Sequence, residues 1–184
     1  MKKESLSKEI SKINKDRLGK DRRKKDACKE ICKEKSKDLR IIDISKKEVV
    51  SRTSIAEGKI VLKKRTIELI KNRKIKKGDV FAVAQIAAIQ AVKRTSEIIP
   101  LCHNIPIECV EIDFEVNDND NSVKVRCKVK STYKTGVEME ALTGVCAALL
   151  TIWDMTKYIE KDRYGKYPDT RIEHIRVIDK IKTK

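Results

Sequence analysis

The chain has 184 residues, enough for one domain of ordinary size, and its 44 Lys and Arg exceed its 28 Asp and Glu, giving a formal charge of +16. The longest runs without a charged residue have 13 residues, too few to cross a bilayer, and the charged start lacks the apolar stretch of a secretory signal. These features predict a cytoplasmic protein that does not span a membrane and has no disulfides.

Residues 1–40 differ in composition from the rest of the chain. They hold 16 basic and 8 acidic residues and no aromatic residue. A segment of this kind cannot bury enough apolar surface to offset its chain entropy. We therefore predict a disordered basic arm over residues 1–40 and a folded domain over residues 41–184.

The apolar pattern after residue 57 predicts alternating strands and helices. The predicted elements, in chain order, are a strand at 58–63, helices at 66–74 and 80–97, strands at 107–116 and 123–130, a helix at 138–160 and a strand at 171–179. This order predicts an α+β, ferredoxin-like βαββαβ fold, in which helices pack on one face of an antiparallel sheet.

The strands at 107–116 and 123–130 alternate apolar and charged residues, and a turn-rich segment at 117–121 joins them. The charged residues are acidic in the first strand and basic in the second. Pairing the two strands therefore sets opposite charges side by side on the outer face of the sheet. The same alternation predicts that Cys109 and Cys127 belong to the core.

Metal and nucleotide motifs are weak in this sequence. There is no C-x-x-C pair, and the spacing of Cys28 and Cys32 is typical of reduced thiols more often than of a metal site. None of the six glycines fits a P-loop or a G-x-G-x-x-G fingerprint. We therefore predict no metal site, and we expect side chains to hold any phosphate group, with Arg52, Lys77 and Lys93 as candidates.

Three places break the local pattern of a core, and the first is near the end of the last predicted helix. Asp154 and Lys157 lie three residues apart on one helix face, directly after an uncharged stretch. They form either a surface ion pair or an acid–base pair in which partial burial poises the lysine.

The second place is the start of the same helix, where Glu138 and Glu140 flank Met139. These carboxylates either favour the positive end of the helix or face a ligand. The third place is the loop that presents Cys102 and His103. A loop histidine is structural or merely exposed more often than functional, and nothing in its context requires Cys102 to be a nucleophile.

Glu140 and Asp154 fall on nearly the same face of this helix but about 21 Å apart along its axis. One small site cannot take both side chains from a single helix. Three arrangements remain: the ligand is long, the two ends serve different sites, or a neighbouring subunit brings its helix end alongside. The third would make the protein an obligate oligomer.

Five motifs stand in order over residues 41–180: Asp43-Ile44-Ser45 with Arg52, Lys77–Val80, Ile98–His103, Thr135–Thr143 and Leu150–Lys157. Together they closely resemble the cyclic pyranopterin monophosphate synthase (MoaC) family of molybdenum cofactor biosynthesis, in its archaeal type. The resemblance implies a lyase that converts 3′,8-cyclo-7,8-dihydro-GTP to cyclic pyranopterin monophosphate and diphosphate. Water opens the imidazole ring, the pterin ring closes and a cyclic phosphate forms, which calls for acids, bases and cations but no cofactor.

Carried over by motif, the resemblance implies that Asp154 is the principal acid or base, that Lys157 is its catalytic partner, and that Lys77 acts on the substrate or its phosphates. The predicted substrate-binding residues are Leu101, Cys102, His103, Glu138, Met139, Glu140, Arg52 and Lys93. Members of the family are homohexamers, trimers of dimers with active sites at the dimer interface, and the resemblance implies the same here. The sequence departs from many members at Asn104, where they have Pro.

The main alternative is a ferredoxin-like nucleic-acid-binding module that uses the basic arm, because a charge of +16 favours nucleic acid. RNA-binding sheets present aromatic residues, whereas the outer rows of this hairpin are charged. Weak nucleic-acid contact through residues 1–40 is therefore predicted only as an accessory property. A second alternative is a catalytically inactive interaction protein, and the intact pair of Asp154 and Lys157 speaks against it.

Overall fold

The structure, a computed structural model, describes residues 39–183. The arm predicted for residues 1–40 and the pair Cys28 and Cys32 therefore lie outside the described residues, except for positions 39 and 40. In chain order the elements are β1 (Val50–Val61), α2 (Lys64–Lys71), α3 (Val80–Lys93), α4 (Thr95–Ile98), β2 (Cys109–Asn117), β3 (Ser122–Tyr133), α5 (Glu138–Glu160) and β4 (Arg171–Thr183).

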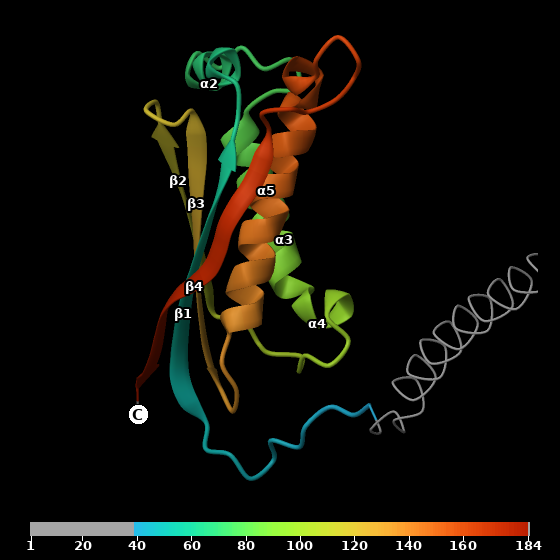
Figure 1. Ribbon diagram of the computed structural model, residues 1–184. Helices are drawn as coiled ribbons and strands as arrows, with labels where there is room; N and C mark the ends of the chain where they lie inside the picture. The colour runs from blue at the N-terminus through green and yellow to red at the C-terminus, as the bar shows by residue number, and fades with distance from the viewer. Residues whose placement is uncertain (1–38, 184) are drawn as a thin grey trace, which may run out of the picture. The chain divides into compact units, whose positions relative to one another are not determined.

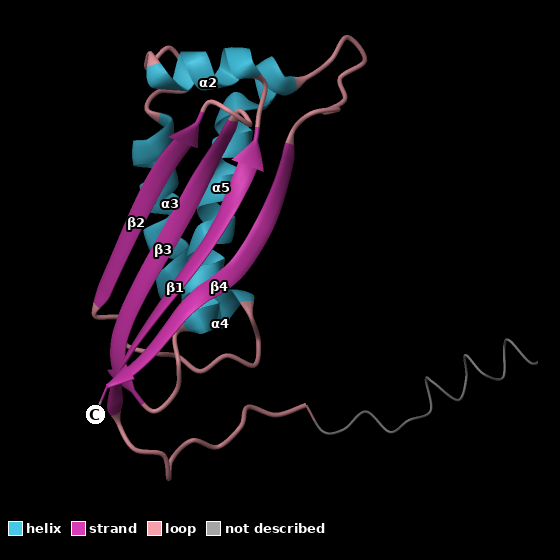
Figure 2. Ribbon diagram, turned by 60° about the vertical axis from the view of Figure 1, so that its left-hand side comes forward, coloured by secondary structure: helices cyan, strands magenta, loops and turns pink. Residues whose placement is uncertain are grey.

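The four strands form one antiparallel sheet in the order β2-β3-β1-β4. The β-α-β unit that begins with β1 supplies inner strand β1 and outer strand β2, and the unit that begins with β3 supplies inner strand β3 and outer strand β4. The two units are thus interleaved in one sheet. Helices α3 and α5 cover a single face of this sheet (Figures 1 and 2), which confirms the predicted α+β fold.

Strands β1 and β4 are longer than their patterns predict. β1 begins at Val50 rather than at Gly58, and β4 continues to Thr183 rather than ending at Asp179. The two extensions have one cause, because β1 and β4 pair with each other from Ser51 opposite Thr183 to Val61 opposite Arg171, with two shifts of register between.

The helix predicted at 80–97 is interrupted. Arg94 leaves the helical conformation with φ −111° and ψ 16°, and the side-chain hydroxyl of Thr95 donates to the carbonyls of Ala91 and Val92. The chain therefore forms α3 and the short α4 in place of one long helix. α2 also ends earlier than predicted, because Asn72 caps it.

The hairpin of β2 and β3 has the predicted register, with Glu111 opposite Lys128. The two side chains pair at 3.1 Å on the outer face. Cys127 is fully buried, as predicted. The prediction for Cys109 was wrong, because Cys109 has the same alternation as Glu111, and its thiol lies 3.7 Å from the Glu111 carboxylate on the outer face.

Helix α5 lies close to both β3 and α3, and glycine makes this possible. A Cβ atom at Gly144 would lie 2.7 Å from the Cys127 Sγ and 2.8 Å from a methyl carbon of Val92. A Cβ at Gly58 in β1 would meet a methyl carbon of Leu149 at 2.9 Å. The close approach fixes the middle of α5 in the core and thereby fixes its two ends.

Several large apolar side chains of the helix layer are exposed. Ile86 of α3 is 59% exposed and Leu150 of α5 is 60% exposed, and Val83 is also exposed. No helix among residues 39–183 combines the length and apolar content needed to cross a membrane.

Candidate active site

Three charged side chains meet near the C-terminal end of α5, and we call Lys77, Asp154 and Lys157 the Asp154 cluster. The Lys157 Nζ lies 2.7 Å from one carboxylate oxygen of Asp154, and the Lys77 Nζ lies 2.6 Å from the other. Lys77 also donates to the main-chain carbonyl of Asp154 at 2.9 Å. Each carboxylate oxygen therefore has its own ammonium group, although Lys77 comes from a different part of the chain.

The two lysines determine the charge of the cluster. Hydrogen bonds from Lys157 and Lys77 lower the pKa of Asp154 to about 2, so Asp154 is ionised at neutral pH. The same contact raises the pKa of Lys157. All three side chains are about half exposed, as in the first of the two interpretations, a surface ion pair, and the hydrogen bond to Asp154 rather than burial shifts the pKa of Lys157.

The loop before α3 positions Lys77. Gly78 takes up a φ of +102°, which glycine adopts readily, and the carboxylate of Asp79 accepts hydrogen bonds from the first amides of α3, as expected of an N-cap. On the other side of Lys77, the backbone N–H of Lys76 donates to the Tyr158 hydroxyl at 3.0 Å. Tyr158 was not singled out from the sequence, although it lies one helical turn beyond Asp154 and could have been found by that spacing.

Other predicted residues belong to two segments, the first turn of α5 with Glu138, Met139 and Glu140 and the loop after α4 with Leu101, Cys102 and His103, and together we call them the Glu140 cluster. Glu140 is only 3% exposed, and burial, with the nearby charge of Glu138, raises its pKa. Burial and the charge of Glu140 in turn raise the pKa of the Cys102 thiol. Cys102 therefore favours its neutral form, which does not support a role as a nucleophile.

Two other members of the Glu140 cluster have partners elsewhere in the chain. The His103 Nε2 lies 2.7 Å from the main-chain carbonyl of Ile42. Glu138 forms an ion pair with Lys180 at the end of β4. The first contact joins the start of the domain to the loop after α4, and the second joins β4 to the first turn of α5.

The two basic residues predicted to hold phosphate differ in their surroundings. Arg52 donates to the main-chain carbonyls of Tyr133 at 3.0 Å and Lys134 at 3.3 Å, so part of its guanidinium holds the end of β3 in place. Lys93 lies exposed in the last turn of α3, and its ammonium has no hydrogen bond or ion pair with residues 39–183. Lys93 is therefore the better placed of the two to meet a ligand.

Replacing Glu140 with glutamine should change how stability depends on pH. A folded-state pKa above the ordinary 4.5 means that the contribution of Glu140 to stability is fully present below pH 4.5 and is lost as the pH rises through the folded-state value. The Glu140→Gln chain should therefore melt a few degrees above the native chain at pH 7 and together with it at pH 4. Thermal unfolding followed by circular dichroism measures both. A Tm difference that grows on acidification would contradict the burial argument.

Helix α5 is unbroken (Figure 1), with Glu140 in its first turn and Asp154 toward its C-terminal end. The 14 residues between Glu140 and Asp154 correspond to about 21 Å. A single chain therefore does not bring the two clusters together. Among residues 39–183, no group of three or more His, Cys, Asp and Glu side chains is arranged to hold a metal ion.

Comparison of the sequence with known proteins identifies its family. A model of the MoaC family matches residues 41–183. The sequence is 57% identical over 146 residues to a protein of Thermococcus kodakarensis named "Probable cyclic pyranopterin monophosphate synthase", covering 79% of this chain and 92% of that protein. A Pyrococcus abyssi protein of the same name is 56% identical over 147 residues, with 80% and 91% covered. A Methanothermobacter thermautotrophicus protein named as an accessory protein of that synthase is 54% identical over 154 residues, with 84% and 96% covered. The chain belongs to the MoaC family.

Proposed function

We propose that this chain is a cyclic pyranopterin monophosphate synthase, a lyase of molybdenum cofactor biosynthesis. Its substrate would be 3′,8-cyclo-7,8-dihydro-GTP, and its products cyclic pyranopterin monophosphate and diphosphate. Family membership over residues 41–183 and the names of the relatives support this proposal. The observation that carries it is the Asp154 carboxylate held between the ammonium groups of Lys77 and Lys157.

The charges of the Asp154 cluster suit a reaction that transfers protons and expels a polyanion. A carboxylate with a pKa of about 2 is a weak base, so in the free protein Asp154 mainly orients the two lysines. When substrate phosphates draw Lys77 and Lys157 away, Asp154 loses the hydrogen bonds that lower its pKa and becomes a stronger base. The lysines then neutralise the leaving diphosphate and can supply protons. These steps transfer protons and a phosphoryl group, and they include no oxidation or reduction.

The other predicted residues would bind the remainder of the substrate. The Glu140 cluster offers acceptors in Glu138 and Glu140, a ring nitrogen in His103, and apolar surface in Leu101 and Met139. Cys102 would line the site as a neutral thiol, and Lys93 and Arg52 would hold phosphate. In this scheme the Glu140 cluster at one end of α5 binds the substrate, and the Asp154 cluster at the other end carries out the chemical steps.

A shared site between two chains would bring the two ends together. We infer the homohexamer, a trimer of dimers, with each active site built from the Asp154 cluster of one chain and the Glu140 cluster of another. The 21 Å separation supports this, as do the exposed apolar side chains of Ile86 in α3 and Leu150 in α5, which a neighbouring subunit would cover. A cytoplasmic location remains the prediction from composition.

Tyr158→Phe is expected to lower kcat/KM about fivefold with only a small fall in thermal stability, because it removes the hydroxyl that holds the backbone next to Lys77, a hydrogen bond of about 1 kcal/mol. Steady-state kinetics with the pterin product as readout measures this. Tyr164→Phe is the matched control, because Tyr164 is exposed in the loop before β4. Equal kinetics for the native chain and Tyr158→Phe would exclude a positioning role.

The proposed function is tested by incubating the purified full-length chain with 3′,8-cyclo-7,8-dihydro-GTP and following diphosphate release and the pterin product. We expect both products in equal amounts, and a folded chain that forms neither would refute the proposal. A chain of residues 41–184 should turn over equally well and lose any RNA affinity. Loss of turnover on truncation would show instead that residues 1–40 belong to the catalytic protein.

A further inference from the structure

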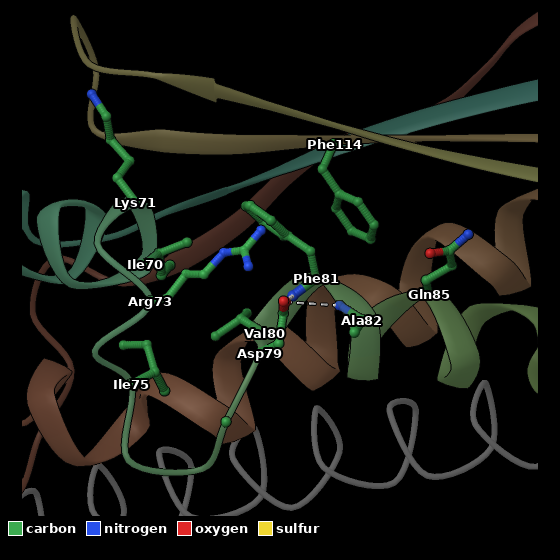
Figure 3. Close-up of a pocket in the computed structure, with 11 residues that line it drawn as sticks. Ile70, Lys71, Arg73, Ile75, Asp79, Val80, Phe81, Ala82, Gln85 and Phe114 are labelled. Carbon is green, nitrogen blue, oxygen red and sulfur yellow. Dashed lines mark hydrogen bonds between the residues drawn. The ribbon is translucent and has the colours of Figure 1, made fainter.

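A cavity of about 460 Å³ lies among the end of α2, the start of α3 and β2 (Figure 3). Its volume falls in the range of small-molecule sites. No residue of the Asp154 cluster or the Glu140 cluster lines it, although Gly78 and Asp79, which follow Lys77 in the chain, do. The proposed reaction therefore leaves this cavity unassigned.

Arg73, at the edge of the cavity, has a backbone conformation that arginine seldom adopts. Its φ is +54°, in the left-handed region. α2 ends there with hydrogen bonds from the Arg73 N–H to the Ile70 carbonyl at 3.0 Å and from the Lys74 N–H to the Leu69 carbonyl at 2.9 Å. Glycine is the usual residue at this position of a helix end, and a side chain there costs about 1 kcal/mol. A residue kept at such a cost is a candidate for a functional role.

The guanidinium of Arg73 extends from the end of α2 into the cavity (Figure 3). It has no hydrogen bond or ion pair with residues 39–183, whereas neighbouring Lys71 is paired with Asp118 at 2.7 Å. The Asp79 carboxylate oxygen Oδ1 is occupied by the amides of Phe81 and Ala82. Within the described chain, Arg73 is therefore the cation of this cavity that is available to an anion, and its planar fork suits phosphate or carboxylate.

Two aromatic rings form another part of the cavity wall. Phe81 of α3 and Phe114 of β2 stack with their ring centroids 4.8 Å apart and their planes at 24°. Both are only partly buried, so ring surface remains accessible. Apolar ring surface in the same cavity as an available guanidinium offers a place for a flat aromatic group that carries an anion.

We propose that this cavity binds a small aromatic anion, with the ring against Phe81 and Phe114 and the phosphate or carboxylate on Arg73. The proposal does not depend on the proposed catalytic function, because the two sites share no side chain. It predicts that binding here needs both the ring and the anionic group.

The chain contains only two phenylalanines, and both line this cavity. Full-length protein labelled with 4-fluorophenylalanine therefore gives two ¹⁹F resonances that report on this site. We expect phenyl phosphate or benzoate to shift both resonances in a saturable manner. Whichever of these two ligands binds more tightly shows whether the site prefers phosphate or carboxylate. Inorganic phosphate lacks the aromatic ring and phenol lacks the anionic group, so each should bind at least about tenfold more weakly than phenyl phosphate. Shifts with inorganic phosphate as strong as with phenyl phosphate would refute an aromatic ligand.

Arg73→Gly tests the role of the guanidinium without endangering the fold, because glycine relieves the backbone at this position. We expect an equal or higher Tm together with an affinity at least about tenfold lower. Lys77→Ala is the control for anions bound at the Asp154 cluster, and it should leave the ¹⁹F titration unchanged. Absence of saturable shifts, unchanged affinity in Arg73→Gly, or loss of binding in Lys77→Ala would each overturn the proposal.

Discussion

Replacing Asp154 with asparagine is expected to lower turnover of 3′,8-cyclo-7,8-dihydro-GTP by about a thousandfold, with the fold retained. General acid–base catalysis contributes about 10²–10⁴-fold, and here the same carboxylate also orients two lysines. Asparagine has nearly the same shape, but it carries no negative charge and presents one carbonyl oxygen where Lys77 and Lys157 each now have an oxygen of their own. Diphosphate release and pterin formation should both fall, because both depend on this cluster.

The control for this substitution is Glu111→Gln on the outer face of the sheet. Glu111 is also an exposed carboxylate paired with a lysine, at 3.1 Å, but it lies in the hairpin of β2 and β3. It should leave turnover unchanged, since an exposed pair contributes little to stability. An Asp154→Asn chain that remains folded and retains more than about a tenth of native turnover would exclude Asp154 as the principal acid or base.

Mixing an inactive Asp154→Asn chain with an inactive Glu140→Gln chain is expected to restore about a quarter of native activity. If each site takes Asp154 from one chain and Glu140 from the other, a mixed pair contains one intact site and one doubly altered site. Random assembly makes about half of the pairs mixed, and half of their sites are intact. The measurement is turnover after the two chains have been unfolded together and refolded.

The control for the mixing experiment places both substitutions on one chain and mixes it with native chains. That mixture should also keep about a quarter of its sites, so it calibrates random assembly. Absence of rescue in confirmed mixed oligomers would show that the site is not shared in this way. If the Glu140→Gln chain alone were fully active, Glu140 would have no place in the site.

The fold could be predicted wherever apolar spacing reflects burial directly. α5 was predicted with its observed bounds, because its pattern runs unbroken from Glu138 to Glu160. The part of β1 before Gly58 was missed, since its buried positions include the small side chains of Ser54 and Ala56. With small or polar side chains at these positions, the segment lacks the alternation of apolar residues by which a strand is predicted.

Less of the candidate site follows from spacing alone. Helical periodicity pairs Asp154 with Lys157, but only the fold brings Lys77 from 77 positions away to the second carboxylate oxygen. The ion pair of Glu138 with Lys180 likewise depends on how far β4 extends, which the sequence did not indicate. Family motifs supplied Lys77 as a candidate, and the structure supplied its partner.

The unbroken course of α5 also restricts how this sequence can diverge. Inserting or deleting one residue between Glu140 and Asp154 would turn the two ends of the helix by about 100° relative to each other and change their separation by about 1.5 Å. Substitutions on the exposed face keep both the angle and the distance. We therefore expect this segment to drift in composition but to keep a constant length, with insertions confined to the loops around it.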